Sequence, residues 1–328
     1  MSKRRMLALC VAGALLLGGC APAAPLKSMA TVVPGMDPVL PQAHAPEALY
    51  TTQMATLYFR FQDEPYLAPE SRVITQAPSE AWELALLTAL LAGPGTHAAS
   101  LTALFPEGTR VLSTARQGRT LFVTLSKELM NPYPDEPAGI TAATADEASL
   151  MRRRLCMQSL VATATENCDV DDVQVLVEQT GTAAESLRLK QRYFLTTEDD
   201  SLLVGVQTRQ EELLLTPGNT LRVILDKWLT RDWARLYLYL MAKDPVSGVE
   251  RPTLSDFVTA MENLPRLAGC DFSGGSVSPD GRWATFTLEA EFLDGSVIRN
   301  LPGRVVRLYR GGDLWQISMA QLTQWLEE

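Results

Sequence analysis

The stretch from Ala81 to Thr109 constrains the fold of this chain most strongly. Apolar residues recur along its first half at the spacing of one helical face, and Ser79 stands where an N-cap is expected. These apolar residues are Trp82, Leu86, Leu87, Leu90 and Leu91. Gly93 and Pro94 end the predicted helix, because glycine adopts the left-handed terminal conformation and proline cannot continue the hydrogen-bond ladder.

A turn follows this helix. The run Phe105–Thr109, with Pro106 and Gly108 inside it, predicts a turn into a strand from Arg110 to Ala115. The stretch consists of an apolar helix and two turns, without an arrangement of reactive groups. It therefore indicates a module that binds or assembles.

Three features in series mark the N-terminus as a secretion signal. A basic start at residues 3–5 precedes an apolar run from Met6 to Leu17, and Gly18-Gly19-Cys20 follow. The apolar run is shorter than the about 20 residues that a membrane-spanning helix needs. Leu17 and the three residues after it resemble a bacterial lipoprotein box, so we expect residues 1–19 to be a signal peptide and Cys20 to carry lipid. An ordinary secretory signal with a chance cysteine is the alternative.

Length and charge narrow the class of protein. The 328 residues, 46% of them hydrophobic, allow about two domains with real cores. The net charge of −9 becomes about −12 once the signal peptide takes its three basic residues away. An acidic surface argues against binding to nucleic acid and against electrostatic docking on anionic lipid.

Three of the five cysteines, Cys156, Cys168 and Cys270, belong to the predicted folded part. A predicted helix from Asp146 to about Glu166 would hold the first two roughly 15 Å or more apart. A disulfide needs Cα atoms within about 7 Å, so this pairing is not expected. The three show no metal-ligand spacing. We expect mostly buried thiols, no metal and no cofactor.

The first folded domain, residues 53–180, follows a flexible tether at residues 20–52 that is rich in proline and alanine. Its elements are predicted in the order strand, strand, helix, strand, strand, helix, strand. In chain order they are Thr56–Phe61, Tyr66–Thr75, the helix described above, Arg110–Arg116, Thr120–Ser126, Asp146–Glu166 and Asp172–Gln179. A turn at Gln117-Gly118-Arg119 predicts a hairpin. This order indicates a small α+β domain with helices against a mixed sheet.

Several motifs of this domain occur in the order seen in a known family. They are Leu57-Tyr58-Phe59, Leu90-Leu91-Ala92-Gly93-Pro94, Phe105-Pro106-Glu107-Gly108-Thr109, Val123-Thr124-Leu125-Ser126 and Gln158-Ser159-Leu160-Val161-Ala162-Thr163. Together they resemble the GerMN domain of bacterial sporulation and spore-germination lipoproteins over residues 53–180. The resemblance implies that Gly93, Pro94, Pro106, Gly108 and Thr109 are structural motif positions. A long insert, Asn131–Ala145, departs from the family pattern.

Residues 181–219 predict a β-rich connector. Strands at Leu187–Leu195 and Leu202–Thr208 flank the acidic turn Glu198-Asp199-Asp200. Tyr193-Phe194 echoes the earlier aromatic pair Tyr58-Phe59, so an eroded second copy of the domain is one interpretation. No second Leu-Leu-x-Gly-Pro helix follows, which argues against it.

Residues 220–328 predict helices followed by an antiparallel sheet. An amphipathic helix from Leu221 to about Leu240 precedes a second one, capped by Thr253 and Asp256. Predicted strands follow at Cys270–Val277, Arg282–Phe292, Val297–Ile298 with Val305–Tyr309, and Leu314–Ser318. The arrangement resembles the NTF2-like α+β cone, a fold that hosts many functions and therefore names no activity. An apolar cavity between the first helix and the sheet is one expectation, and a filled core is the other.

The sequence holds no set of side chains typical of catalysis. His97 stands in an Ala/Ser loop, and Ser126-Lys127 is an ordinary strand-end pair. Clustered carboxylates such as Asp199-Asp200 could bind calcium, but they lack the spacing of a calcium-binding hand and are typical of solvated turns. No phosphate loop or dinucleotide fingerprint occurs. We therefore predict a protein that is not an enzyme.

The insert Asn131–Ala145 is the candidate interaction loop. A polar, proline-rich loop on a secreted scaffold has little packing role, and such loops often carry contacts. Its candidate contact residues are Tyr133, Asp135 and Glu136. A merely tolerated insertion is the alternative.

The resemblance implies a lipid-anchored protein on the extracytoplasmic face of the membrane, acting as a non-catalytic scaffold in sporulation or spore germination. Expected partners are other envelope or sporulation proteins, in an assembly between forespore and mother cell, and peptidoglycan. Lipid on Cys20 would contact the membrane, and no nucleic acid is expected. Two alternatives are a lipoprotein that binds a small apolar ligand or peptide in its NTF2-like cavity, and an envelope hydrolase that acts on peptidoglycan.

Overall fold

The computed structural model describes residues 50–179 and 185–324 of the chain. The predicted signal peptide, Cys20 and nearly all of the tether lie outside these residues. Residues 48–328 form one compact unit. Within the described part, no helix combines the length and the apolar character that a membrane crossing requires.

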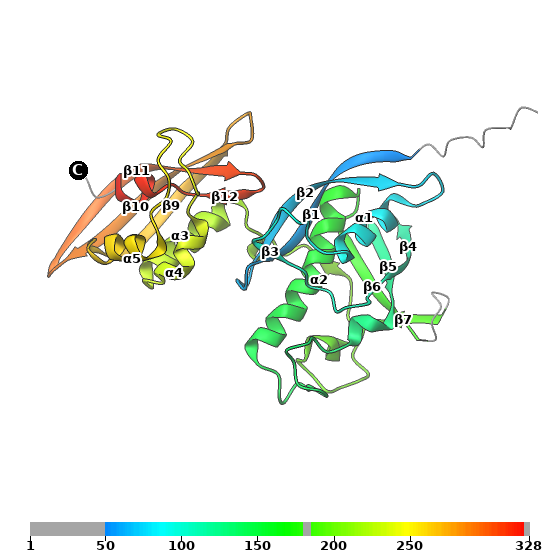
Figure 1. Cartoon of the computed structure of the whole chain (residues 1–328). Coiled ribbons are helices and arrows are strands. Elements are labelled where there is room, and N and C mark those ends of the chain that lie inside the picture. The colour runs from blue at the N-terminus through cyan, green and yellow to red at the C-terminus, as the bar shows by residue number, and fades with distance from the viewer. Residues whose placement is uncertain (1–49, 180–184, 325–328) are drawn as a thin grey trace, which may run out of the picture. The chain divides into compact units, whose positions relative to one another are not determined.

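The first domain follows the predicted order of strands and helices (Figure 1). Its elements are β1 (Thr51–Phe61), β2 (Leu67–Gln76), α1 (Trp82–Leu91), β3 (Leu101–Thr102), β4 (Val111–Gln117), β5 (Thr120–Leu125), α2 (Glu147–Asn167) and β6 (Asp172–Glu178). Only the two-residue strand β3 and a 3₁₀ turn at Lys127–Met130 were not predicted. Helix α1 begins after Ala81, which makes no side-chain cap, so the predicted cap at Ser79 is wrong. Asp146 does cap α2, because its side chain accepts a hydrogen bond from the Ser149 N–H.

The strands of this domain form two sheets rather than one. A three-stranded antiparallel sheet has the order β2-β1-β3. A mixed sheet has the order β4-β5-β6-β7, where β7 is Ser186–Arg188, and its strands β5 and β6 run parallel and place Val123 beside Val175. The fold class is therefore α+β, with the expected mixed sheet and a separate antiparallel one.

Helix α2 lies along the open edge of β1 and satisfies its backbone. Three polar residues spaced four apart, Ser159, Thr163 and Asn167, share one helical face. The Tyr58 N–H donates to Thr163 Oγ1 at 3.1 Å, and Ser159 Oγ donates to the Tyr58 carbonyl at 2.6 Å. Asn167 accepts from the Thr56 N–H and donates to the Thr56 carbonyl, both at 2.8 Å. Along Thr56–Tyr58 these bonds take the place of a neighbouring strand, whereas β3 pairs with β1 only at Arg60 and Phe61.

The connector adds two strands to the mixed sheet, both much shorter than the predicted ones. Short strands β7 (Ser186–Arg188) and β8 (Gln207–Thr208) both pair with β6. The segment Gln191–Phe194, predicted as strand, is a 3₁₀ turn whose Tyr193 is buried. The sheet of the first domain therefore also includes strands that follow residue 180.

The C-terminal part contains helices and then an antiparallel sheet, as predicted. The elements are α3 (Pro217–Leu229), α4 (Trp233–Leu236), a 3₁₀ turn (Tyr237–Tyr239), α5 (Leu254–Glu262), β9 (Arg266–Val277), β10 (Trp283–Asp294), β11 (Val297–Gly311), β12 (Leu314–Gln316) and α6 (Met319–Gln324). The single long helix predicted from Leu221 is wrong, because Arg231 is left-handed (φ 58°) and Asp232 caps a new helix. Thr253 does cap α5.

One face of the sheet β12-β11-β10-β9 carries the core of this part, against the helices (Figure 1). Trp228 of α3 meets Phe292 of β10 edge to face, with ring centroids 6.0 Å apart, and both are buried. Large side chains therefore occupy this part of the space between the first helix and the sheet. The NTF2-like resemblance of this part stays a prediction.

Candidate functional site

Two motifs of the first domain hold tight turns. Gly93 has a φ of +88°, and its carbonyl accepts a hydrogen bond from the Arg72 guanidinium at 3.0 Å. Arg72 also donates to the Ala89 carbonyl at the end of α1 and pairs with Glu70. Glu70 in turn accepts from the Gly95 N–H at 3.0 Å. Strand β2 thereby anchors the end of α1, where a cation is favoured by the helix dipole.

The second motif forms the turn before β4. Gly108 has a φ of +83°, a conformation that favours glycine. Thr109 Oγ1 donates to the Pro106 carbonyl at 2.6 Å, and the Arg110 N–H donates to Ser126 Oγ at 3.0 Å. Pro94 and these motif residues therefore lie in turns that position strands, away from the cleft described below.

Two adjacent arginines of α2 hold the insert in place. The ring of Tyr133 lies under Arg152 and Arg153, whose guanidinium carbons are 4.8 and 5.3 Å from its centroid. The Tyr133 hydroxyl donates to the Leu104 carbonyl at 2.6 Å. Arg152 pairs with Asp135, and Arg153 pairs with Glu136 through both of its terminal nitrogens.

The second ion pair is almost entirely removed from water. The side chains of Arg153 and Glu136 are 6% and 2% exposed, whereas Asp135 is 64% exposed. Tyr133 is also buried. Two of the three candidate contact residues, Tyr133 and Glu136, therefore attach the insert to α2 and are not available to a partner. Asp135 faces solvent but is engaged by Arg152.

The charges of this cluster are reflected in the pKa values. Burial alone would raise the pKa of Glu136, but the Arg153 guanidinium and the Tyr133 N–H outweigh it and lower that pKa. Hydrogen bonding to Arg152 lowers the pKa of Asp135 to about 2. Burial raises the pKa of the Cys156 thiol to about 11, although the Tyr193 and Tyr133 hydroxyls oppose this. Burial and the raised pKa favour the protonated thiol at neutral pH, a form that is a weak nucleophile.

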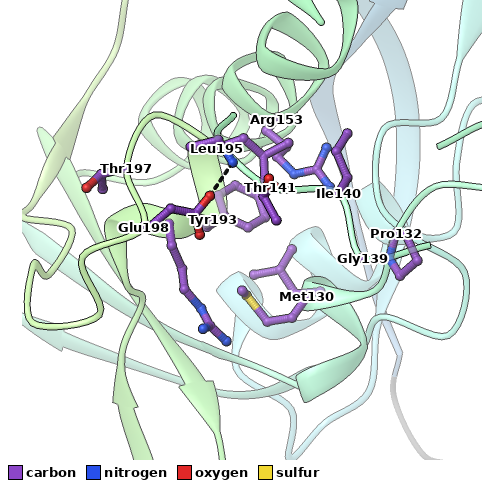
Figure 2. A pocket seen from close by; sticks show the side chains of 13 residues that line it. Met130, Pro132, Gly139, Ile140, Thr141, Arg153, Tyr193, Leu195, Thr197 and Glu198 are labelled. Carbon is purple, nitrogen blue, oxygen red and sulfur yellow. Dashed lines mark hydrogen bonds between the residues drawn. The ribbon is translucent and has the colours of Figure 1, made fainter. Parts of the chain in front are cut away.

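A cleft of about 360 Å³ opens between the insert and the connector. Figure 2 shows Tyr193 between the connector residues Thr197 and Glu198 on one side and Ile140 of the insert on the other. The Ala142 N–H donates to the Glu198 carboxylate, which joins the two segments. The full lining is Leu129, Met130, Pro132, Gly139, Ile140, Thr141, Ala142, Arg153, Arg192, Tyr193, Leu195, Thr197 and Glu198.

Leu195 stands out among the lining residues. It is buried and adopts a left-handed conformation, with φ 54° and ψ 29°. A bulky side chain in this region of the Ramachandran plot is uncommon and costs roughly 1–2 kcal/mol. Such strain gathers at binding sites, where the surrounding structure maintains it. Sequence reasoning missed the connector wall of the cleft, because Leu187–Leu195 was predicted as a strand and Glu198 as part of an acidic turn.

The polar groups of this region pair with one another. Arg192 pairs with Asp200 at 3.0 Å, and the Asp199 carboxylate accepts a hydrogen bond from the Ser201 N–H. Both carboxylates of the acidic turn therefore have partners within this chain. His97 lies exposed in a turn far along the chain from the cleft residues. Among the residues that the structure describes, no group of three His, Cys, Asp or Glu side chains could hold a metal ion.

Solved structures are similar to parts of this chain. The tandem GerMN domains of the sporulation protein GerM from Bacillus subtilis share 16% identity with it, at a TM-score of 0.32, over 56% of this chain and 50% of that one. The chain thus spans half the length of that structure. The first GerMN domain of the same protein shares 17% identity, at a TM-score of 0.31, over 46% of this chain and 97% of that one.

A putative lipoprotein from Clostridium perfringens shares 18% identity, at a TM-score of 0.28, over 50% of this chain and 90% of that one. No curated protein sequence matches the chain. Residues 56–181 match the model of the Germane family, described as sporulation and spore germination, and this match covers nearly the same residues as the predicted first domain.

Proposed function

We propose that this chain is a lipid-anchored, non-catalytic interaction protein that acts outside the cytoplasmic membrane in sporulation or spore germination. The match of residues 56–181 to the Germane family is the observation that carries the proposal. Support for the anchor comes from the lipoprotein box at Cys20. A tether of about 30 residues would let the folded part reach up to roughly 100 Å from the membrane.

The cleft between the insert and the connector is the proposed contact surface for a partner protein of the envelope. Its walls come from two loop segments that are tied to a rigid helix, an arrangement in which loops commonly carry binding. The part of the insert after Glu136 supplies the half-buried Ile140 and Thr141, and the connector supplies the half-buried Thr197. A partner held near the same membrane would meet this surface at a raised local concentration.

Photocrosslinking in sporulating cells of the native host tests the contact surface. A photoreactive amino acid is placed at Ile140 in one strain and at the exposed His97 in a matched control strain. We expect the Ile140 strain to form a discrete crosslinked species during sporulation and the His97 strain to form none. Equal crosslinking at both positions would argue against a contact in the cleft.

Fluorescence localisation of the chain through starvation tests the cellular role. We expect the protein to appear during sporulation and to concentrate at the membrane around the forespore. Constant and uniform display in growing cells would contradict the sporulation role while leaving the contact surface testable by crosslinking.

A further inference from the structure

A second pocket, of about 610 Å³, lies in the C-terminal part of the chain. The loop from Met241 to Pro252 forms one wall, and α5 and α6 form the others. The lining surface is mostly apolar, and the apolar residues in it are Met241, Val249, Pro252, Ala260, Met319 and Ala320. Its size falls in the range of about 300–1,000 Å³ that is usual for ligand sites.

Apolar surface continues outside this pocket. Val246 and Val249 on the loop are 81% and 64% exposed, and Leu254 at the start of α5 is 42% exposed. The loop is nevertheless well held, because the Asp244 N–H donates to the Val249 carbonyl at 2.8 Å and the Gly248 N–H donates to the Asp244 carbonyl at 2.9 Å. An ordered loop that presents two valines to water indicates a surface that another molecule covers.

The rim of the pocket carries an excess of negative charge. Asp244, Glu250 and Asp256 line it, and no ion pair involves any of them within the described ranges 50–179 and 185–324. The single cation of the rim, Arg251, is already engaged: it donates to the Leu240 carbonyl at 3.2 Å and lies 4.5 Å above the ring of Tyr237. An occupant with a positive charge beside an apolar group complements this surface.

We propose that this pocket docks a peptide segment of a partner protein in which an apolar side chain adjoins a lysine or arginine. The apolar side chain fills the pocket, and the basic side chain meets the carboxylates of the rim. A small molecule enclosed by the pocket would leave Val246 and Leu254 exposed, whereas a peptide that crosses the rim covers them. This surface belongs to the C-terminal part, and the inference does not depend on the cleft of the first domain.

Binding of three matched peptides to the mature chain, residues 20–328, tests the proposal. The first is an acetylated and amidated Gly-Phe-Lys-Leu-Lys-Gly, the second has glutamate for both lysines, and the third has serine for phenylalanine and leucine. We expect the first peptide to bind, measured by fluorescence anisotropy of a labelled form, and each of the other two to bind at least tenfold more weakly.

Three variants locate the site. Ala320→Trp fills the pocket from an exposed position, and Glu250→Lys reverses a rim charge. Each should weaken binding of the first peptide at least tenfold. Glu289→Lys makes the same charge change at an exposed position of β10, outside this pocket, and should leave binding unchanged. Circular dichroism verifies that each variant is folded.

Several outcomes would overturn the proposal. The first is that none of the peptides binds at millimolar concentration, and the second is that the glutamate peptide binds as well as the lysine peptide. Full binding by folded Ala320→Trp would place the peptide elsewhere. Self-association of the chain alone, seen by sedimentation velocity and abolished by Ala320→Trp, would assign the pocket to a second copy instead of a partner.

Discussion

At the residue scale, the two adjacent arginines of α2 provide a natural comparison of buried and exposed ion pairs. Arg153→Ala would leave the Glu136 carboxylate buried without its partner, which typically costs about 3–5 kcal/mol. Arg152→Ala removes an ion pair whose carboxylate, Asp135, is largely exposed. Loss of that ion pair should lower the free energy of unfolding by less than about 1 kcal/mol. Urea unfolding of the mature chain measures the loss of stability in both variants. Equal losses of stability in the two variants would contradict the burial of the second pair.

The same cluster predicts how stability responds to acid. The pKa values of Asp135 and Glu136 are lower in the folded chain than their ordinary values of 3.8 and 4.5, so the folded state binds fewer protons. Their contribution to stability is therefore complete above about pH 4.5 and is lost as the pH falls toward the folded value, about 2 for Asp135.

We expect the free energy of unfolding to fall between pH 4.5 and 2, and Glu136→Gln to fall less steeply than the wild type over this interval. Glu107→Gln, at an exposed turn position, serves as the control for removal of a carboxylate. Urea midpoints measured at successive pH values give the slopes. A variant slope equal to that of the wild type would exclude Glu136 as a source of the acid response.

Some of the residues of the first domain could be predicted from the sequence and others could not. The turn residues Gly93, Gly108 and Thr109 were recognised because their local motifs carry the information. Tyr133 and Glu136 were taken for exposed contacts because a polar, proline-rich loop is usually solvated. Nothing in the spacing shows that Arg152 and Arg153, about one helical turn into the next helix, face back onto this loop.

At the scale of elements, side chains of α2 form the hydrogen bonds that a neighbouring strand would otherwise form with the backbone of β1. Thr163→Val keeps the shape of the side chain but removes the acceptor of the Tyr58 N–H, which leaves a buried donor unpaired. We expect a loss of about 1–3 kcal/mol in the free energy of unfolding. Thr165→Val on the same helix is the control, because the Thr165 hydroxyl only donates to carbonyls of its own helix. Hydrogen exchange at Tyr58 should rise in the first variant and not in the second.

The elements that could be predicted are those with strong local signals. The apolar pattern located α2 to within a few residues, a capping pair located α5, and a glycine turn located the hairpin of β4 and β5. The strands predicted in the connector were largely wrong, because its apolar residues, Tyr193 among them, are buried by distant segments. Such burial does not require the alternating pattern of a strand. The prediction of one long helix was wrong because the left-handed conformation of Arg231 does not change the spacing of the apolar residues around it.

At the scale of the molecule, the turn between β1 and β2 packs against the helices of the C-terminal part. Phe61 lies against Tyr239 with ring centroids 5.3 Å apart. The side chain of Glu64 is only 2% exposed and lies 3.2 Å from Arg235 and 3.6 Å from Lys227. These partners are far apart in the sequence, and no local pattern could have predicted them.

Glu64→Gln should therefore destabilise the whole unit of residues 48–328 by about 1–3 kcal/mol, because two cations lose their shared carboxylate. Glu212→Gln, which alters an exposed ion pair with Arg154, should change stability by less than about 1 kcal/mol. Thermal unfolding followed by calorimetry tests both. A Glu64→Gln variant as stable as the wild type would show that this ion pair does not hold the unit together.

Attachment to the membrane is proposed here through lipid on Cys20, a residue outside the described part of the chain. If Cys20 carries the lipid, Cys20→Ala should move the protein from the membrane fraction to the soluble extracytoplasmic fraction, because the acyl chains supply the binding energy. Cys10→Ala, inside the predicted signal peptide, is the matched control and should leave the protein on the membrane. Fractionation and immunoblotting of both strains give the answer. Retention of Cys20→Ala on the membrane at wild-type levels would mean that the chain is held by another contact, and the pocket beside Val249 would then be the first surface to vary.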